Sequence, residues 1–449
     1  MNILPKSLRK RIADRPNLLK IADNVGWLVL DKVVRMGVGL FVAVWIARYL
    51  GPAQYGMISF GWALVAVFGA ITGLGLRNVV VRDIVRDPSS ANVTLGVAAV
   101  LQLIAGIIAY ILLLIAVAYL RHDDPVARGV VALLGSMLLL ESSKIAGFWF
   151  ESQVQSKYVV WVENGALLAF AAVKVALILV EAPLAAFVWA ALAEAITVAC
   201  FLLLVMNKKG PSIGSLHVRV KHMKLLLGDS WPLLISGLLV ALNTRADVIM
   251  IGQMIGDTAA GIYAAAARLS EVWYVIIPIV VNSIFPSIAL LHARRSSKMP
   301  IIWSRAYTLM TWMSISAAAT LTLFADQLVY LTYGNSYLDA APIIAIHAWA
   351  GVNVALGTIW AKYMLLKNAQ RVVLYGQSAG VVVNIGLNLY LIPKFALVGA
   401  AVATLIGGTV SSIINFSMYH PRETFGYLWA AVNIKYLKDF RLFSFVKKD

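Results

Sequence analysis

The sequence has 449 residues, of which 61% are apolar and only 13% are charged, and its mean hydropathy is +0.82. Soluble domains average about 45–50% apolar and about 25% charged residues, so this composition excludes an ordinary soluble globule and indicates a polytopic membrane protein. Apolar segments of about 20 residues, which suffice to cross a bilayer, follow one another with short loops between them. These loops leave no room for a separate soluble catalytic domain.

The net charge of +17 is distributed unevenly along the chain. When successive loops are assigned to alternate sides of the membrane, most of the 38 Lys and Arg residues fall on one side, together with both termini. This is the positive-inside asymmetry of a membrane protein with two cytoplasmic ends. We therefore expect anionic phospholipids to be the partners of the surface basic residues, and we expect no nucleic-acid binding.

The first half of the chain predicts a six-helix lobe, residues 1–206. It begins with a basic stretch from Lys6 to Lys20, and the apolar run that follows is too long for a removed signal peptide, so we expect a cytoplasmic tail and first anchor. Six spans are predicted, at Asn24–Ala47, Gly56–Val81, Asn92–Leu120, Ala127–Phe150, Tyr158–Val180 and Leu184–Met206.

The second half predicts a matching lobe, residues 229–420, after a basic cytoplasmic linker at residues 207–228. Its six spans are predicted at Ser230–Ile251, Ala259–Leu290, Pro300–Phe324, Ala340–Met364, Val372–Ile392 and Val398–Tyr419. The tail at residues 421–449 mixes aromatic and basic residues and is too polar to span, which favours a cytoplasmic interfacial helix.

One sequence frame occurs in both halves. W-I-A-R-Y-L-G-P-A-Q-Y-G (Trp45–Gly56) returns as M-I-G-Q-M-I-G-D-T-A-A-G (Met250–Gly261), with glycines at equivalent places between apolar helices. Two unrelated hairpins with similar glycine turns would share this pattern, but internal repeats are frequent in transporter folds. We predict an all-α integral membrane protein of about 12 transmembrane helices in two pseudo-symmetric six-helix lobes, with parallel repeats and a central cavity.

The charged residues inside the predicted spans form the first candidate site, a binding site for an anionic ligand. Each charge at the centre of a membrane costs about 2.5–3.5 kcal/mol even on a lenient scale, so these residues should face protein or water. Arg binds phosphate oxygens with two parallel donors, which favours a basic cavity for an anionic ligand. The alternatives are ion pairs within the spans, Arg268 with Glu271 and in part Asp31 with Arg35, and snorkelling towards the membrane surface. The basic candidates are Lys32, Arg35, Arg77, Lys174, Arg245 and Arg268.

Small and amide-bearing residues recur every four positions near the end of the chain. Gly376, Gly380, Asn384 and Asn388 form one such face, and Ala400, Thr404 and Gly408 form another. Close helix packing with cross-helix hydrogen bonds is one interpretation. The other is a site built only from oxygen ligands for a coupling cation, made by Asp247, Asn384, Asn388 and Thr404.

Sequence motifs for catalysis are absent. We find no phosphate-binding loop, no zinc-ligand spacing and no nucleophile elbow. The sequence therefore predicts a protein that is not an enzyme, with no catalytic residue, no cofactor and no metal beyond a sodium site.

Several stretches resemble bacterial polysaccharide transporters, the flippases of O-antigen and exopolysaccharide repeat units. In the first half these are N-V-G-W-L-V-L-D-K-V-V-R, I-A-R-Y-L-G-P-A-Q-Y-G and G-L-G-L-R-N-V-V-V-R-D-I. In the second half they are S-W-P-L-L-I-S, R-A-D-V-I-M-I-G, G-I-Y-A-A-A-A-R-L-S-E and I-F-P-S-I-A. The likeness covers nearly the whole chain, although these motifs are shared in part with the wider superfamily of multidrug, oligosaccharidyl-lipid and polysaccharide exporters.

The resemblance implies a V-shaped pair of six-helix bundles in the bacterial inner membrane. Such proteins flip undecaprenyl-diphosphate-linked oligosaccharides from the inner to the outer leaflet by alternating access, driven by a Na⁺ or H⁺ gradient. Carried onto this chain, the cationic cavity residues would be Arg35, Arg77, Arg245 and Arg268, with Asp247 as the coupling residue. A polysaccharide polymerase and chain-length proteins would be further partners.

Two other functions are weighed against this one. An ion-coupled multidrug exporter of the same superfamily would need an acidic or aromatic cavity, and here the basic residues in spans only slightly outnumber the acidic ones. A membrane-embedded glycosyltransferase or polymerase would be expected to carry a large loop with acidic metal ligands, whereas the loops here are short and basic.

Overall fold

The structure is a computed structural model that describes residues 16–294, 299–420, 426 and 429. These residues form helices and connecting turns, without a β-strand among them. They divide into two compact units, Met1–Ala241 and Leu242–Asp449. The predicted all-α membrane fold is confirmed.

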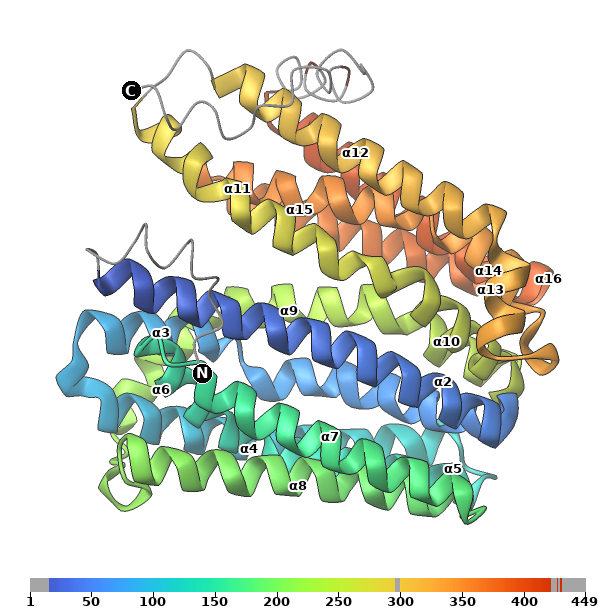
Figure 1. Cartoon of the computed structure of the whole chain (residues 1–449), viewed down its shortest axis with the longest axis horizontal. Helices are drawn as coiled ribbons and strands as arrows, with labels where there is room; N and C mark the ends of the chain where they lie inside the picture. Colours follow the sequence, from blue (N-terminus) through green and yellow to red (C-terminus); the bar gives the residue numbers. More distant parts are fainter. Residues whose placement is uncertain (1–15, 295–298, 421–425, 427–428, 430–449) are drawn as a thin grey trace. The chain divides into compact units, whose positions relative to one another are not determined.

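The first unit is a bundle of long helices. In Figure 1, α2 packs against α4, α5 and α7, and α7 packs against α8. The last helix, α9, starts in this unit and ends in the second. The helices and 3-10 segments are α2 (Pro16–Gly73), α3 (Leu76–Arg86), η1 (Pro88–Ser90), α4 (Ala91–Leu120), α5 (Pro125–Gly135), η2 (Ser136–Lys144), α6 (Ile145–Ser152), α7 (Lys157–Leu179), α8 (Leu184–Lys209), η3 (Ile213–Ser215) and α9 (Val220–Met254).

The glycines of the repeated frame form turns. At about 1.5 Å per residue the 58 residues of α2 would extend about 87 Å, far more than the ~30 Å hydrocarbon core of a bilayer. Gly51 breaks the helix, since its φ of 72° and ψ of 170° are non-helical. Gly256, with φ 124°, separates α9 from the following helix. Both values lie in the region that favours glycine, which confirms the predicted turns.

The second unit is also helical throughout its described residues. Its long last helix, α16, is broken at Ala396, where φ is 48° and ψ is −129°. Its elements after α9 are α10 (Asp257–Glu271), η4 (Val272–Val275), α11 (Ile276–Ala293), α12 (Met299–Leu323), α13 (Ala325–Thr332), η5 (Asn335–Tyr337), α14 (Ala340–His347), α15 (Ala350–Leu366) and α16 (Gln370–Met418).

The number of spans is consistent with the prediction. Nine helical stretches among the described residues are long and apolar enough to cross a membrane, and the pair α12 and α13, bent by 69°, makes a tenth. Dividing α2 at Gly51 and α16 at Ala396 adds one span each. The protein is therefore a multi-pass membrane protein, consistent with twelve spans.

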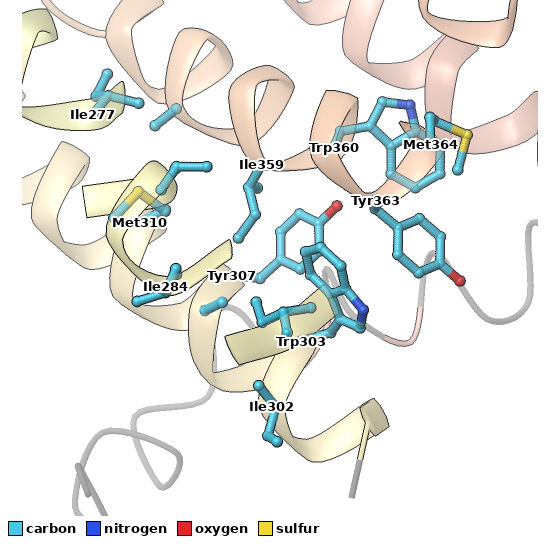
Figure 2. Packing of buried hydrophobic residues seen from close by; sticks show 14 of the residues in the cluster. Ile277, Ile284, Ile302, Trp303, Tyr307, Met310, Ile359, Trp360, Tyr363 and Met364 are labelled. Atoms are coloured by element: carbon cyan, nitrogen blue, oxygen red, sulfur yellow. The ribbon is translucent and has the colours of Figure 1, made fainter. Parts of the chain in front are cut away.

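An aromatic core holds one end of the second unit together. Trp303 meets Tyr363 edge-to-face with ring centroids 5.0 Å apart, and Trp360 meets Phe416 in the same way at 4.9 Å. Figure 2 shows Trp303 and Tyr307 of α12 pointing towards Trp360 and Tyr363 of α15. Edge-to-face aromatic pairs contribute about 0.5–1.5 kcal/mol beyond the area that they bury, so this core fixes α12 against α15.

Part of the predicted basic linker packs on the first unit. The backbone N–H of His217 donates to the carbonyl oxygen of Asn92 at 3.2 Å, and Thr94 Oγ1 lies 3.2 Å from His222 Nε2. Residues 207–228 thus belong to the first compact unit, whose limit falls inside α9. The lobe limits at 206 and 229 stay a prediction, and most of the tail at 421–449 lies outside the described residues.

Candidate functional site

A buried carboxylate, Asp247 on α9, is the centre of a polar cluster in the second unit. Its exposed fraction is 4%. Asn388 Nδ2 donates to Asp247 Oδ1 at 2.6 Å, and the Tyr263 hydroxyl donates to Oδ2 at 2.9 Å. The Thr404 hydroxyl also donates to Oδ2. Burying a charge is costly unless it is hydrogen-bonded, and here donors from α10 and from both parts of α16 stabilise it.

The amide side chains extend this cluster. Asn388 Nδ2 lies 3.2 Å from Asn384 Oδ1, and Asn384 Nδ2 lies 3.3 Å from Thr404 Oγ1. Both Asn side chains are buried, with exposed fractions of 1% and 0%. The four residues predicted for the coupling ion, Asp247, Asn384, Asn388 and Thr404, are therefore neighbours. Together with Tyr263 they form what we call the Asp247 cluster.

Glycines bring the two parts of α16 close enough to form this cluster. A Cβ atom on Gly380 would lie 2.9 Å from the carbonyl oxygen of Gly407, and one on Gly407 would lie 2.8 Å from Asn384 Cβ. These distances are too short for any side chain without movement of the backbone. The predicted close packing is confirmed, and it places Asn384 beside Thr404, so the two interpretations of this pattern are compatible.

The Asp247 cluster offers carboxylate, amide and hydroxyl oxygens, which are the ligand types that hard cations prefer. Binding of a coupling ion by these residues stays a prediction. The cluster has one carboxylate, and no group of three or more His, Cys, Asp or Glu residues suited to a metal occurs among the described residues.

In the first unit, Arg35 is paired with two carboxylates. Arg35 Nε donates to Asp31 Oδ1 at 2.7 Å, one helical turn away on α2, and a terminal nitrogen of Arg35 donates to Glu163 on α7. The side chains are partly exposed, at 41% for Arg35, 16% for Asp31 and 32% for Glu163. We call these three residues the Arg35 clamp. The Asp31–Arg35 ion pair weighed in the sequence is present.

Two more of the predicted basic residues also pair with carboxylates. Lys174 Nζ lies 2.6 Å from Glu194 Oε2. Arg77 donates to both oxygens of Glu151, at 2.8 Å and 3.2 Å. Half of the predicted anion-binding set therefore has a carboxylate partner within the first unit. Lys32, Arg245 and Arg268 are exposed, and the binding of an anion by these six residues stays a prediction.

Sequence reasoning did not assign a role to Tyr263 or to the carboxylates Glu151, Glu163 and Glu194. Tyr263 lies in one of the resembling stretches, but no fixed spacing links a residue of α10 to Asp247 on α9. Glu163 and Glu194 are visible as acidic residues inside spans. Their partners could not be assigned because ion pairs between helices depend on how the helices rotate and pack.

Comparison with known proteins gives the family. A family profile described as "Polysaccharide biosynthesis protein" matches residues 21–292, more than half of the chain. The chain belongs to the polysaccharide biosynthesis protein family. The resemblance found in the sequence is confirmed at this level.

Relatives of this polysaccharide biosynthesis protein include a curated protein and solved structures. It is 23% identical over 400 residues to the "Probable low-salt glycan biosynthesis flippase Agl15" of Haloferax volcanii, covering 86% of this chain and 81% of the relative. An inward-facing multidrug resistance MATE family transporter has a TM-score of 0.71 at 15% identity, covering 91% and 96% of the two chains. Lipid II flippase MurJ, in an inward closed conformation, has a TM-score of 0.70 at 13% identity, covering 93% and 95%. At these identities the two structures show a shared fold.

Proposed function

We propose that this protein is a flippase that moves an oligosaccharide, linked to undecaprenyl diphosphate, from the inner to the outer leaflet. Support comes from its family and from a relative named as a glycan biosynthesis flippase. The named relatives are flippases and transporters, so we infer transport without a chemical reaction. Basic residues inside spans offer partners for a diphosphate that must cross hydrocarbon.

The Asp247 cluster is the observation that supports ion coupling. A carboxylate buried inside a membrane protein is costly and usually marks an ion or proton pathway. Here hydroxyl and amide groups satisfy Asp247, and the same groups carry oxygens that can bind Na⁺. We infer that binding and release of Na⁺ or H⁺ at this cluster drives alternating access.

We also propose a cellular localisation and partners for the protein. We place the protein in the inner membrane of a bacterial cell with both termini cytoplasmic, on the basis of its charge asymmetry. Its cargo would be an O-antigen or exopolysaccharide unit, received on the cytoplasmic side and passed to a polysaccharide polymerase and chain-length proteins. Anionic phospholipids would contact the surface Lys and Arg residues.

A reconstituted flipping assay tests this proposal. The full chain is placed in proteoliposomes with a fluorescent undecaprenyl-diphosphate oligosaccharide, and the fraction that reaches the opposite leaflet is measured under a Na⁺ gradient or an H⁺ gradient. We expect flipping under at least one gradient and its loss in Asp247→Asn, which keeps the size of the side chain but removes its charge. If the protein flips the lipid-linked sugar under neither the Na⁺ gradient nor the H⁺ gradient, the proposed function is refuted.

One observation favours a multidrug exporter as the second candidate. Arg35, Arg77 and Lys174 each pair with a carboxylate, which lowers the net positive charge available to an anion. The fold is also that of a multidrug transporter. Gradient-driven export of a cationic dye from the same proteoliposomes, without flipping of the lipid-linked sugar, would support this candidate.

A further inference from the structure

In the Arg35 clamp, one edge of the guanidinium, formed by Nε and a terminal nitrogen, already donates to carboxylates. We infer that Glu163 is a positioning residue that competes with a phosphate group for Arg35, so that the phosphorylated headgroup binds by exchanging with Glu163 and leaves when Glu163 returns. This inference rests on the proposed flippase function and specifies how the anion is held and released.

The donors that Glu163 and Asp31 occupy are those that a phosphate would use. Arg35 directs Nε to Asp31 and a terminal nitrogen to Glu163. A guanidinium binds phosphate and carboxylate through the same planar fork. A phosphate that binds this edge of the guanidinium, through Nε and the same terminal nitrogen, must displace one of the two carboxylates.

Glu163 is the carboxylate that can exchange. Asp31 lies one turn from Arg35 on the same helix, α2, so the two residues stay together however the helices move. Glu163 is on a different helix, α7, and its side chain is twice as exposed as that of Asp31, 32% against 16%. A small displacement of α7 or a change of rotamer at Glu163 therefore opens one edge of Arg35, while Asp31 keeps the guanidinium in place.

Other charges near the clamp make the exchange feasible. The clamp has two carboxylates and one guanidinium, and Glu194 on α8 also acts electrostatically on Arg35. Lys144 of η2 and Arg77 of α3 act on Glu163. When Glu163 leaves Arg35, two other cations can therefore attract it. These are Lys144, which now pairs with Glu141, and Arg77, which now pairs with Glu151.

The clamp also explains how a strongly bound anion could be released. A diphosphate held by an uncompensated guanidinium in a membrane interior would dissociate slowly, since little water is present to compete. Glu163 supplies that competitor within the protein. Removing its charge should strengthen anion binding and slow release, which is the opposite of what structural damage would do.

The test is an affinity measurement on the full-length protein with Glu163→Gln. The probes are inorganic pyrophosphate and a short-chain polyprenyl diphosphate, each titrated by calorimetry in detergent. Because partly exposed ion pairs contribute up to about 1 kcal/mol, we expect Glu163→Gln to bind about five-fold more tightly and to flip substrate more slowly. A gain with both probes means that phosphate alone is recognised, and a gain with the lipid probe alone means that the lipid form is required; either gain supports the exchange.

The chain supplies a matched control. Arg82 on α3 also pairs with two carboxylates, Asp83 and Asp229, so Asp83→Asn removes one partner from an equivalent arginine outside the clamp. Its affinity for both probes should equal that of the unchanged protein. Glu163→Asp, which retains the charge, should restore weaker binding and faster flipping.

Two results would overturn the inference. One is an affinity in Glu163→Gln that is unchanged or weaker, although the unchanged protein flips the lipid-linked sugar. The other is a gain in affinity that persists in the Arg35→Gln background, because Glu163 would then act on something other than Arg35. Absence of flipping in the unchanged protein would instead count against the proposed function, so the two failures are distinguishable.

Discussion

Replacing Asn388 with Ala tests the Asp247 cluster most directly. The substitution removes the 2.6 Å hydrogen bond from Asn388 Nδ2 to Asp247 and the 3.2 Å bond to Asn384. Both bonds are donated by the amide nitrogen, so their loss should lower the free energy of unfolding, by about 1.5–3 kcal/mol for a hydrogen bond to a charged group. The variant also loses one amide oxygen that could contact a cation. If the lost oxygen contributes about 1.4 kcal/mol to cation binding, which corresponds to a factor of ten, we expect the apparent affinity for Na⁺ to fall about ten-fold.

The assay for Asn388→Ala is the flipping rate in proteoliposomes as a function of Na⁺ concentration. The midpoint of thermal unfolding with and without Na⁺ gives a second reading that does not depend on the substrate. Asn353→Ala is the matched control, since its amide donates to Thr409 at 3.2 Å. An Asn388→Ala protein with the same Na⁺ dependence as the control would refute a cation site at this cluster.

Three further predictions concern stability and are measured as the free energy of unfolding of the purified protein. Tyr263→Phe removes one donor to the buried Asp247 carboxylate and should cost about 1–3 kcal/mol; no loss would mean that the hydroxyl contributes nothing to the cluster. Gly380→Val should cost about 1–3 kcal/mol because its side chain would meet the backbone of Gly407, whereas Gly386→Val, with open space around it, should cost much less. Trp303→Ala should cost about 3–5 kcal/mol, since this side chain is only 1% exposed in the aromatic core, and a cost below 1 kcal/mol would contradict that packing.

Hydropathy and glycine placement predicted most of the fold. Apolar runs located the spans, because the length of a span is set by the bilayer and can be read without tertiary information. The turns at Gly51 and Gly256 were predicted because glycine tolerates positive φ. The break at Ala396 was expected only as a loop, since nothing in the local sequence indicates that a non-glycine residue has positive φ there.

Irregularities inside spans were not predicted. The predicted span Gly56–Val81 ends earlier, and α3 begins after the positive φ of Leu74 and Gly75. The predicted span Ala259–Leu290 contains the 3-10 segment η4 between α10 and α11. Such irregularities arise when a helix packs against its neighbours. A uniformly apolar sequence does not reveal where they occur.

The two candidate sites differ in how many of their residues could be predicted from the sequence. The Asp247 cluster was predicted except for Tyr263, because Asn384, Asn388 and Thr404 follow a four-residue spacing that places them on one face of each helix. The carboxylate partners of Arg35, Arg77 and Lys174 were not assigned. Glu163, Glu151 and Glu194 lie on other helices, and the rotation of one helix against another decides which charges meet.

The bend at Ala396 bears on the ion binding that we propose for the Asp247 cluster. A residue other than glycine held at positive φ stores about 1–3 kcal/mol of backbone strain. This bend joins the helix carrying Asn388 to the helix carrying Thr404, so in this proposal the strained backbone limits how closely the two can approach a bound ion. Glycine at 396 would relax that constraint, and the protein would then be expected to discriminate less sharply between Na⁺ and the larger K⁺.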